Sequence, residues 1–106
     1  MKLLNLLLAS FLALAITSTS LMADASRGQK VFIKFLKEPC GMDGAIFALK
    51  HTQDEWRQIK ADGKAEAEIM KFCPNYVEGS VKPNLLNSVM DFSIEFASDS
   101  GNVPAC

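Results

Sequence analysis

The chain has 106 residues, with 11 basic and 12 acidic side chains and a formal net charge of −1 at pH 7. A protein that binds the phosphate backbone of nucleic acid needs a concentrated basic face. Here the lysines and arginines are spread along the chain and interleaved with acids. This balance excludes nucleic acid as an expected partner.

The first 25 residues have the features of an export signal. Lys2 supplies a positive start, residues 3–16 are almost wholly apolar, and the triplet Ala23-Asp24-Ala25 offers a cleavage point. The apolar stretch is too short to span a bilayer, and nothing downstream is apolar enough to hold a membrane. We expect residues 1–25 to be removed as a secretory signal peptide, with cleavage after Ala23 as a close alternative. Residues 26–106 are then one periplasmic or secreted domain without a membrane anchor.

The mature chain opens with a predicted helix from Ser26, which can cap it, to about Lys37. Pro39 and Gly41 are expected to end this helix. Its apolar stripe at helical spacing consists of Val31, Phe32, Phe35 and Leu36. A short apolar run over residues 45–49 predicts one or two further turns of helix.

The clearest local signal is a capping box from Thr52 to Glu55, which predicts the start of a helix at this point. This helix pauses at Gly63, and a further helix runs from about Lys64 to Pro74, or the two form one kinked helix. The residues expected to face inward are Trp56, Ile59, Ala65, Ile69, Phe72 and Cys73. The alternating charges of residues 60–71 indicate a solvated helix face.

Residues 75–82 predict a surface loop, and Pro83 suits the first turn of a last helix that runs to about Ala97. Its apolar stripe consists of Leu85, Val89, Phe92 and Phe96. The segment Asp99-Ser100-Gly101 ends it. No stretch alternates like a strand, so the expected fold is all-α.

Three cysteines, Cys40, Cys73 and Cys106, are expected to meet an oxidising compartment, where thiols pair and an odd count leaves one over. A disulfide closing a loop of 33 residues is worth about 3.5 to 4 kcal/mol in the chain-entropy model. The preferred pair is Cys73 with Cys106, because it secures a tail that otherwise has no anchor. Cys40 with Cys106 is nearly as plausible, and the spacing does not choose.

Gly28, Phe32 and Gly41 lie in a segment, Gly28 to Gly44, that resembles the start of class I cytochrome c proteins. In that family a glycine, an aromatic residue four positions on, and then Cys-x-x-Cys-His follow one another along the first helix. Gly28 and Phe32 match, but the five haem-attaching places read Leu36-Lys37-Glu38-Pro39-Cys40. The resemblance implies a small bundle of four to five helices in which the first and last helices cross.

Covalent haem needs two thiols and an adjacent histidine, and Leu36 and Pro39 cannot form thioethers. Haem held without covalent bonds is the alternative, through Cys40 or His51. The candidate ligands are Cys40, His51, Met42, Met70 and Met90. The simpler interpretation of the methionines is that they pack in the core and bind no ligand. We expect no cofactor, with eight aromatic residues of the mature chain filling the space that haem would take.

Acids near His51, namely Asp54 and Glu55, suggest acid-base chemistry, but no nucleophile accompanies them and Glu55 belongs to the helix cap. No Cys and His spacing suits a metal ion. We therefore expect no catalytic residues, no metal site and no enzymatic activity. The expected function is that of an exported cytochrome c-like protein without covalent haem, which binds an unknown periplasmic protein as an accessory of a redox system. An electron carrier with non-covalent haem is the alternative, and thiol redox chemistry at an unpaired cysteine ranks third.

Overall fold

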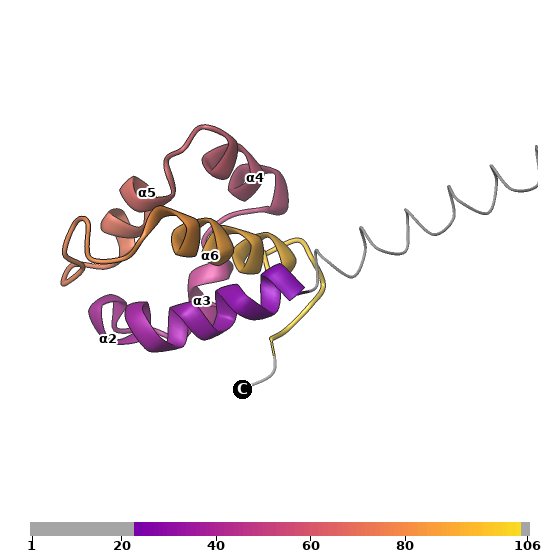
Figure 1. The fold of residues 1–106 in the computed structure, drawn as a ribbon. Coiled ribbons are helices and arrows are strands. Elements are labelled where there is room, and N and C mark those ends of the chain that lie inside the picture. The colour runs from indigo at the N-terminus through magenta and orange to yellow at the C-terminus, as the bar shows by residue number, and fades with distance from the viewer. Residues whose placement is uncertain (1–22, 105–106) are drawn as a thin grey trace, which may run out of the picture.

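In the computed structural model, which describes residues 23–104, the first helix packs directly against the last, α6 (Pro83–Glu95) (Figure 1). The contact is made at Gly28. A Cβ atom at this position would overlap the carbonyl oxygen of Ser88 and lie 2.8 Å from Cβ of Phe92. Only glycine lets the two helix backbones approach this closely.

The first helix is longer than expected and contains a wide turn. Residues 23–31 are helical, a π-helical turn η1 follows at Phe32–Leu36, and α2 (Lys37–Cys40) continues it. The N–H of Lys37 donates to the carbonyl of Phe32, five residues back. Because the wide turn opens the backbone just ahead of Pro39, the helix passes this proline. It ends at Gly41, whose φ of 64° is left-handed.

The wide turn also corrects the predicted apolar stripe. Phe35 is 39% exposed, whereas Phe32 and Leu36 are completely buried. A π turn rotates the chain less per residue than an α turn, so Phe35 is carried away from the core. The expectation that Phe35 packs inward was wrong.

The remaining helices follow the expected order, as α3 (Gly44–Ala48), α4 (Gln53–Ala61) and α5 (Ala65–Phe72). Both hydrogen bonds of the predicted capping box are present at the start of α4. Gly63, with a φ of 68°, separates α4 from α5, which are therefore two helices and not one kinked helix. No residue between 23 and 104 belongs to a strand, so the all-α prediction is confirmed for this part of the chain.

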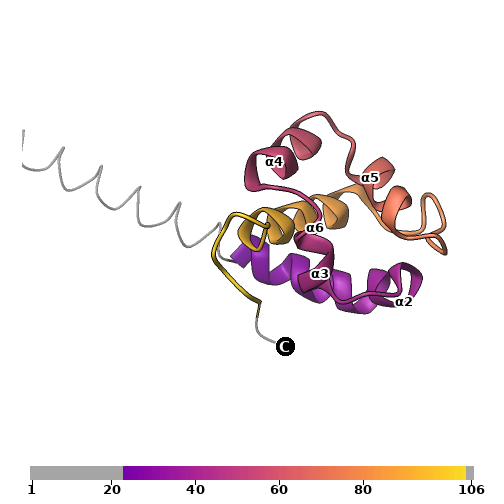
Figure 2. The ribbon, with the colours of Figure 1, turned by 180° about the vertical axis from the view of Figure 1, so that it is seen from behind.

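The helices are arranged around α6. Both views place α4 and α5 on one side of α6 and the first helix on the other (Figures 1 and 2). The short helix α3 lies between α6 and the first helix. The loop at residues 75–82 is present as predicted, but it is attached to the core by two buried side chains, Tyr76 and Val81. No helix in the described range has the length and apolar character needed to cross a membrane.

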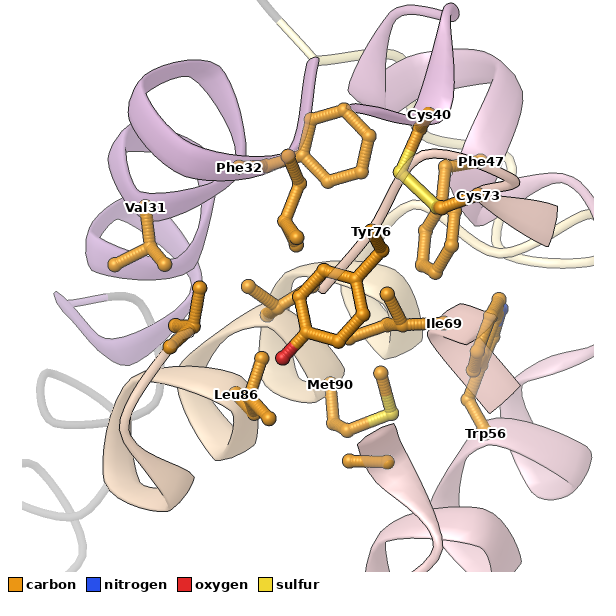
Figure 3. Close-up of a cluster of buried hydrophobic side chains, with 14 of the residues drawn as sticks. Val31, Phe32, Cys40, Phe47, Trp56, Ile69, Cys73, Tyr76, Leu86 and Met90 are labelled. Atoms are coloured by element: carbon orange, nitrogen blue, oxygen red, sulfur yellow. A yellow bond between two sulfur atoms is a disulfide. The ribbon is translucent and has the colours of Figure 1, made fainter. Parts of the chain in front are cut away.

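The core combines aromatic rings with aliphatic side chains such as Val31, Ile69 and Leu86 (Figure 3). The rings of Phe47 and Trp56 stack with centroids 5.2 Å apart, and the ring of Phe32 lies 5.2 Å from that of Phe47 on the other side. The indole N–H of Trp56 donates to the carbonyl of Ala48 at 2.9 Å, so the one polar atom of this buried side chain is satisfied. Phe92 is buried as well, 6.5 Å from Phe32.

A disulfide joins Cys40 to Cys73, which overturns the preferred pairing of Cys73 with Cys106 and the second choice, Cys40 with Cys106. It connects the end of the first helix to the end of α5, beside a hydrogen bond from the Asn75 N–H to the Pro39 carbonyl. Cys40 and Cys73 are 5% and 2% exposed, so the cross-link lies in the core (Figure 3). Cys106 lies outside the described residues.

The chain after α6 is held by hydrogen bonds, which removes the reason for preferring a cysteine anchor. The Ser98 N–H donates to the His51 carbonyl at 3.1 Å. The Gln53 N–H donates to the Asp99 carboxylate at 2.8 Å. The start of α4 and the end of α6 are thereby tied together, and the predicted break at Asp99 to Gly101 is also a contact point.

Candidate functional site

His51 lies at the meeting point of three segments of the fold. Its Nε2 atom is 2.9 Å from Oε1 of Glu68 on α5, and its Nδ1 atom is 3.7 Å from Oε2 of Glu55 on α4. The ring meets that of Trp56 edge-on, with centroids 4.7 Å apart. The imidazole is therefore held by carboxylates on both nitrogens and by an aromatic ring.

Glu68 was expected on a solvated helix face, yet it is only 7% exposed. Burial acts to raise its pKa, but hydrogen bonds from His51 and from Lys71, at 2.9 and 3.1 Å, hold the pKa of Glu68 below its ordinary value of 4.5. The expectation of a fully solvated face over residues 60–71 was wrong at this position. Its partner lies 17 residues earlier in the chain, beyond the reach of helical periodicity.

The capping carboxylate is the second acid of this cluster. The Thr52 backbone N–H and then the Thr52 side chain lower the pKa of Glu55, and His51 contributes to a smaller extent. The groups that touch the imidazole are thus two carboxylates with lowered pKa values and aromatic rings. These contacts tie α4 to α5 through the imidazole.

The predicted haem ligands differ in their surroundings. Cys40 has its sulfur in the disulfide and lacks the thiolate that iron would need. Met90 is completely buried in the core, Met42 packs against its edge, and Met70 is 43% exposed on α5. In residues 23–104 no three potential ligands among His, Cys, Asp and Glu meet as a metal ion would require.

Two hollows on the surface of the described residues bear on the site, and none of Cys40, Met42, His51, Met70 and Met90 lines either of them. One, of about 480 Å³, lies between α4 and α6 and is crossed by an ion pair between Lys60 and Asp91 at 2.6 Å. The other, of about 270 Å³, lies between the first helix, α3 and the tail. We call the second hollow the apolar groove; its walls include Ile33, Ala45, Phe92 and Pro104.

A row of cations lies beside the apolar groove. We call it the basic row; it consists of Arg27, Lys30, Lys34 and Lys37. All four are exposed on the first helix, and no acidic residue occurs in residues 26–37. The interpretation that basic residues are interleaved with acids does not hold within residues 26–37, although Asp24 and Glu38 lie on either side of this stretch in the same helix. The signal was present in the sequence as a spacing of three, four and three residues.

No protein-family model, no curated protein and no solved structure matches the chain. What the protein does is therefore inferred from its own residues and their contacts.

Proposed function

We propose that the protein is an exported, haem-free relative of cytochrome c that acts as a non-enzymatic binding or accessory protein of a periplasmic redox system. The redox context comes from the resemblance of the segment between Gly28 and Gly44 to class I cytochromes c. The proposed absence of haem is supported by the packing of the same segment in the folded protein.

The observation that carries the proposal is the burial of Leu36. This residue occupies the place of the first haem-linked cysteine in the resemblance, and it is completely buried in the protein core. Cys40, in the place of the iron-binding histidine, is cross-linked to Cys73. The positions that face haem in a cytochrome thus face protein atoms in this chain.

The aromatic core supports the same proposal. Phe32, Phe47 and Trp56 form a chain of ring contacts in the core, in which Phe47 stacks on Trp56 and is tilted against Phe32, and each is completely buried. Aromatic side chains bury about 150 to 250 Å² each, so these rings supply the apolar contact that a porphyrin would otherwise provide. A binding role then falls to the surface of the protein.

The test is the absorption spectrum of the protein purified from the periplasm. We expect no Soret band after gel filtration. We also expect that added haemin is removed by a second column, equally in the wild type and in His51→Ala. A haem band that survives gel filtration and is lost in His51→Ala would replace this proposal with the electron carrier.

The accessory role is tested separately by crosslinking in intact cells, followed by purification under denaturing conditions. A specific, saturable partner of the redox chain is the expected product. A protein that stays monomeric and without a partner under growth conditions that require the redox chain would contradict this role. The spectrum and the crosslinking thus examine the two halves of the proposal independently.

A further inference from the structure

We propose that the basic row and the apolar groove together dock an acidic protein segment with one apolar anchor residue. This inference rests on the binding role proposed above and names the chemistry of the partner. The anchor enters the groove, and carboxylates on either side of it pair with the basic row.

The basic row gives the exposed part of the first helix an excess of positive charge. Residues 23–40 form one uninterrupted helix on which all four cations are exposed. Arg27 and Lys30 belong to its α-helical first part, whereas Lys37 follows the π turn at Phe32–Leu36 and lines the apolar groove. The opposite side of the helix, with Val31, Phe32 and Leu36, is buried in the core. The cations therefore face solvent and are fixed in direction by the packing of the helix behind them.

The charge of the rest of the molecule sharpens this asymmetry. Four of the ten basic residues after Ala25 belong to the basic row, and the remaining chain carries six basic and eleven acidic residues. A small protein with one positive face and a negative remainder attracts and orients an acidic surface as it approaches. The net charge of −1 conceals this distribution.

The apolar groove has the size of an anchor site. Its volume of about 270 Å³ lies below the range of about 300 to 1,000 Å³ typical of small-molecule pockets. A single large apolar side chain suits it better than a haem or another large cofactor. Ile33, which is 57% exposed, lines the groove and comes directly before Lys34 of the basic row. Apolar and electrostatic contacts are thus side by side.

A carboxylate at the rim distinguishes a protein partner from other polyanions. Asp43 lines the groove and pairs with Lys37 at 3.4 Å, with both side chains more than half exposed. Such an exposed pair is weak, so an incoming carboxylate exchanges with it at little cost. A dense array of phosphates would be repelled by Asp43. Insertion of the first helix into a membrane would need Val31, Phe32 and Leu36, which are buried in the core.

The experiment uses the uniformly ¹⁵N-labelled protein, purified from the periplasm, and three capped synthetic peptides. The probe has one leucine flanked on each side by two glutamates. One matched peptide has glutamine in place of every glutamate, and the other has alanine in place of leucine. We expect the probe to shift amide signals confined to the basic row and the groove walls, namely residues 27–37, 43–46, 92 and 103, and both matched peptides to bind more weakly.

The variants compare equal changes in net charge at two places. The double variant Lys30→Glu, Lys34→Glu is expected to weaken binding of the probe by about tenfold, because it reverses the charge at the centre of the basic row. Lys64→Glu with Lys82→Glu changes the net charge equally at exposed sites on other elements and should leave binding within about twofold. Ile33→Ser should weaken binding of the probe. Val77→Ser, which removes another exposed apolar side chain, should leave binding unchanged.

If the two double variants weaken binding of the probe equally, the binding depends on net charge and not on the basic row, which would overturn the proposal. Signal shifts outside the stated residues, or none, would do the same. Sedimentation with phosphatidylglycerol vesicles that depends on Lys30 and Lys34, without peptide binding, would assign the face to a membrane instead. A protein without a haem spectrum that does not bind the probe would refute the docking face alone. A protein that retains haem and binds the probe would refute only the haem-free function.

Discussion

Replacing Gly28 with alanine is expected to force the first helix away from α6. The new Cβ atom would overlap the Ser88 carbonyl oxygen and lie 2.8 Å from Cβ of Phe92. The overlapped oxygen belongs to a helix backbone and cannot rotate away, so the helices must separate along their contact. Overpacking of this kind costs about 1 to 3 kcal/mol, and we take the upper end because the clash is with backbone.

Helix propensity acts in the opposite direction. Alanine is favoured over glycine inside a helix by about 1 kcal/mol. The clash outweighs this gain, so Gly28→Ala should lower the free energy of unfolding by about 2 kcal/mol. Lys30→Gly is the matched control for propensity, because Lys30 is exposed on the same helix and should lose about 1 kcal/mol. Urea unfolding followed by the fluorescence of the buried Trp56 measures both. A Gly28→Ala protein as stable as the wild type would refute the close contact.

Three further predictions concern the disulfide, the buried acid and the core. Replacing Cys40 and Cys73 together by serine should lower the free energy of unfolding by about 3.5 to 4 kcal/mol, and alkylation of the denatured wild type should modify one thiol; three modified thiols in mass spectrometry would contradict the cross-link. Burial acts to raise the pKa of Glu68, but hydrogen bonds to its carboxylate outweigh burial and lower it. The carboxylate therefore stabilises the fold fully above about pH 5, and this stabilisation is lost as pH falls through the folded-state pKa. The stability difference between wild type and Glu68→Gln should therefore shrink from pH 7 to pH 3 in urea titrations, and a constant difference would count against this. Leu36→Ala should cost about 2 to 5 kcal/mol, against no more than about 0.5 kcal/mol for the exposed neighbour Ile33→Ala, and equal losses in thermal melts would show that Leu36 is not buried.

The features predicted well from the sequence are those fixed by neighbouring residues. The capping box between Thr52 and Glu55, the break at Gly63 and the proline start of α6 all depend on contacts within a few positions. Each has a local physical cause that does not require knowledge of the fold. The order of the helices followed from these signals.

The features that could not be predicted depend on partners distant in the sequence. The choice of Cys40 for Cys73 requires the ends of two helices to meet, and the burial of Glu68 requires His51, 17 residues away. Phe35 was misplaced because periodicity assumes α geometry, and the π turn departs from it. The basic row is the exception, since its spacing was readable but was averaged into the composition of the whole chain.

The cross-link has a practical consequence for anyone handling the protein. Cys40 and Cys73 enclose α3, α4 and α5 in one covalent ring. A protease that cuts once between residues 41 and 72 therefore releases no fragment. Such nicked molecules would migrate as intact chains until a reducing agent is added, so integrity has to be judged on reduced samples.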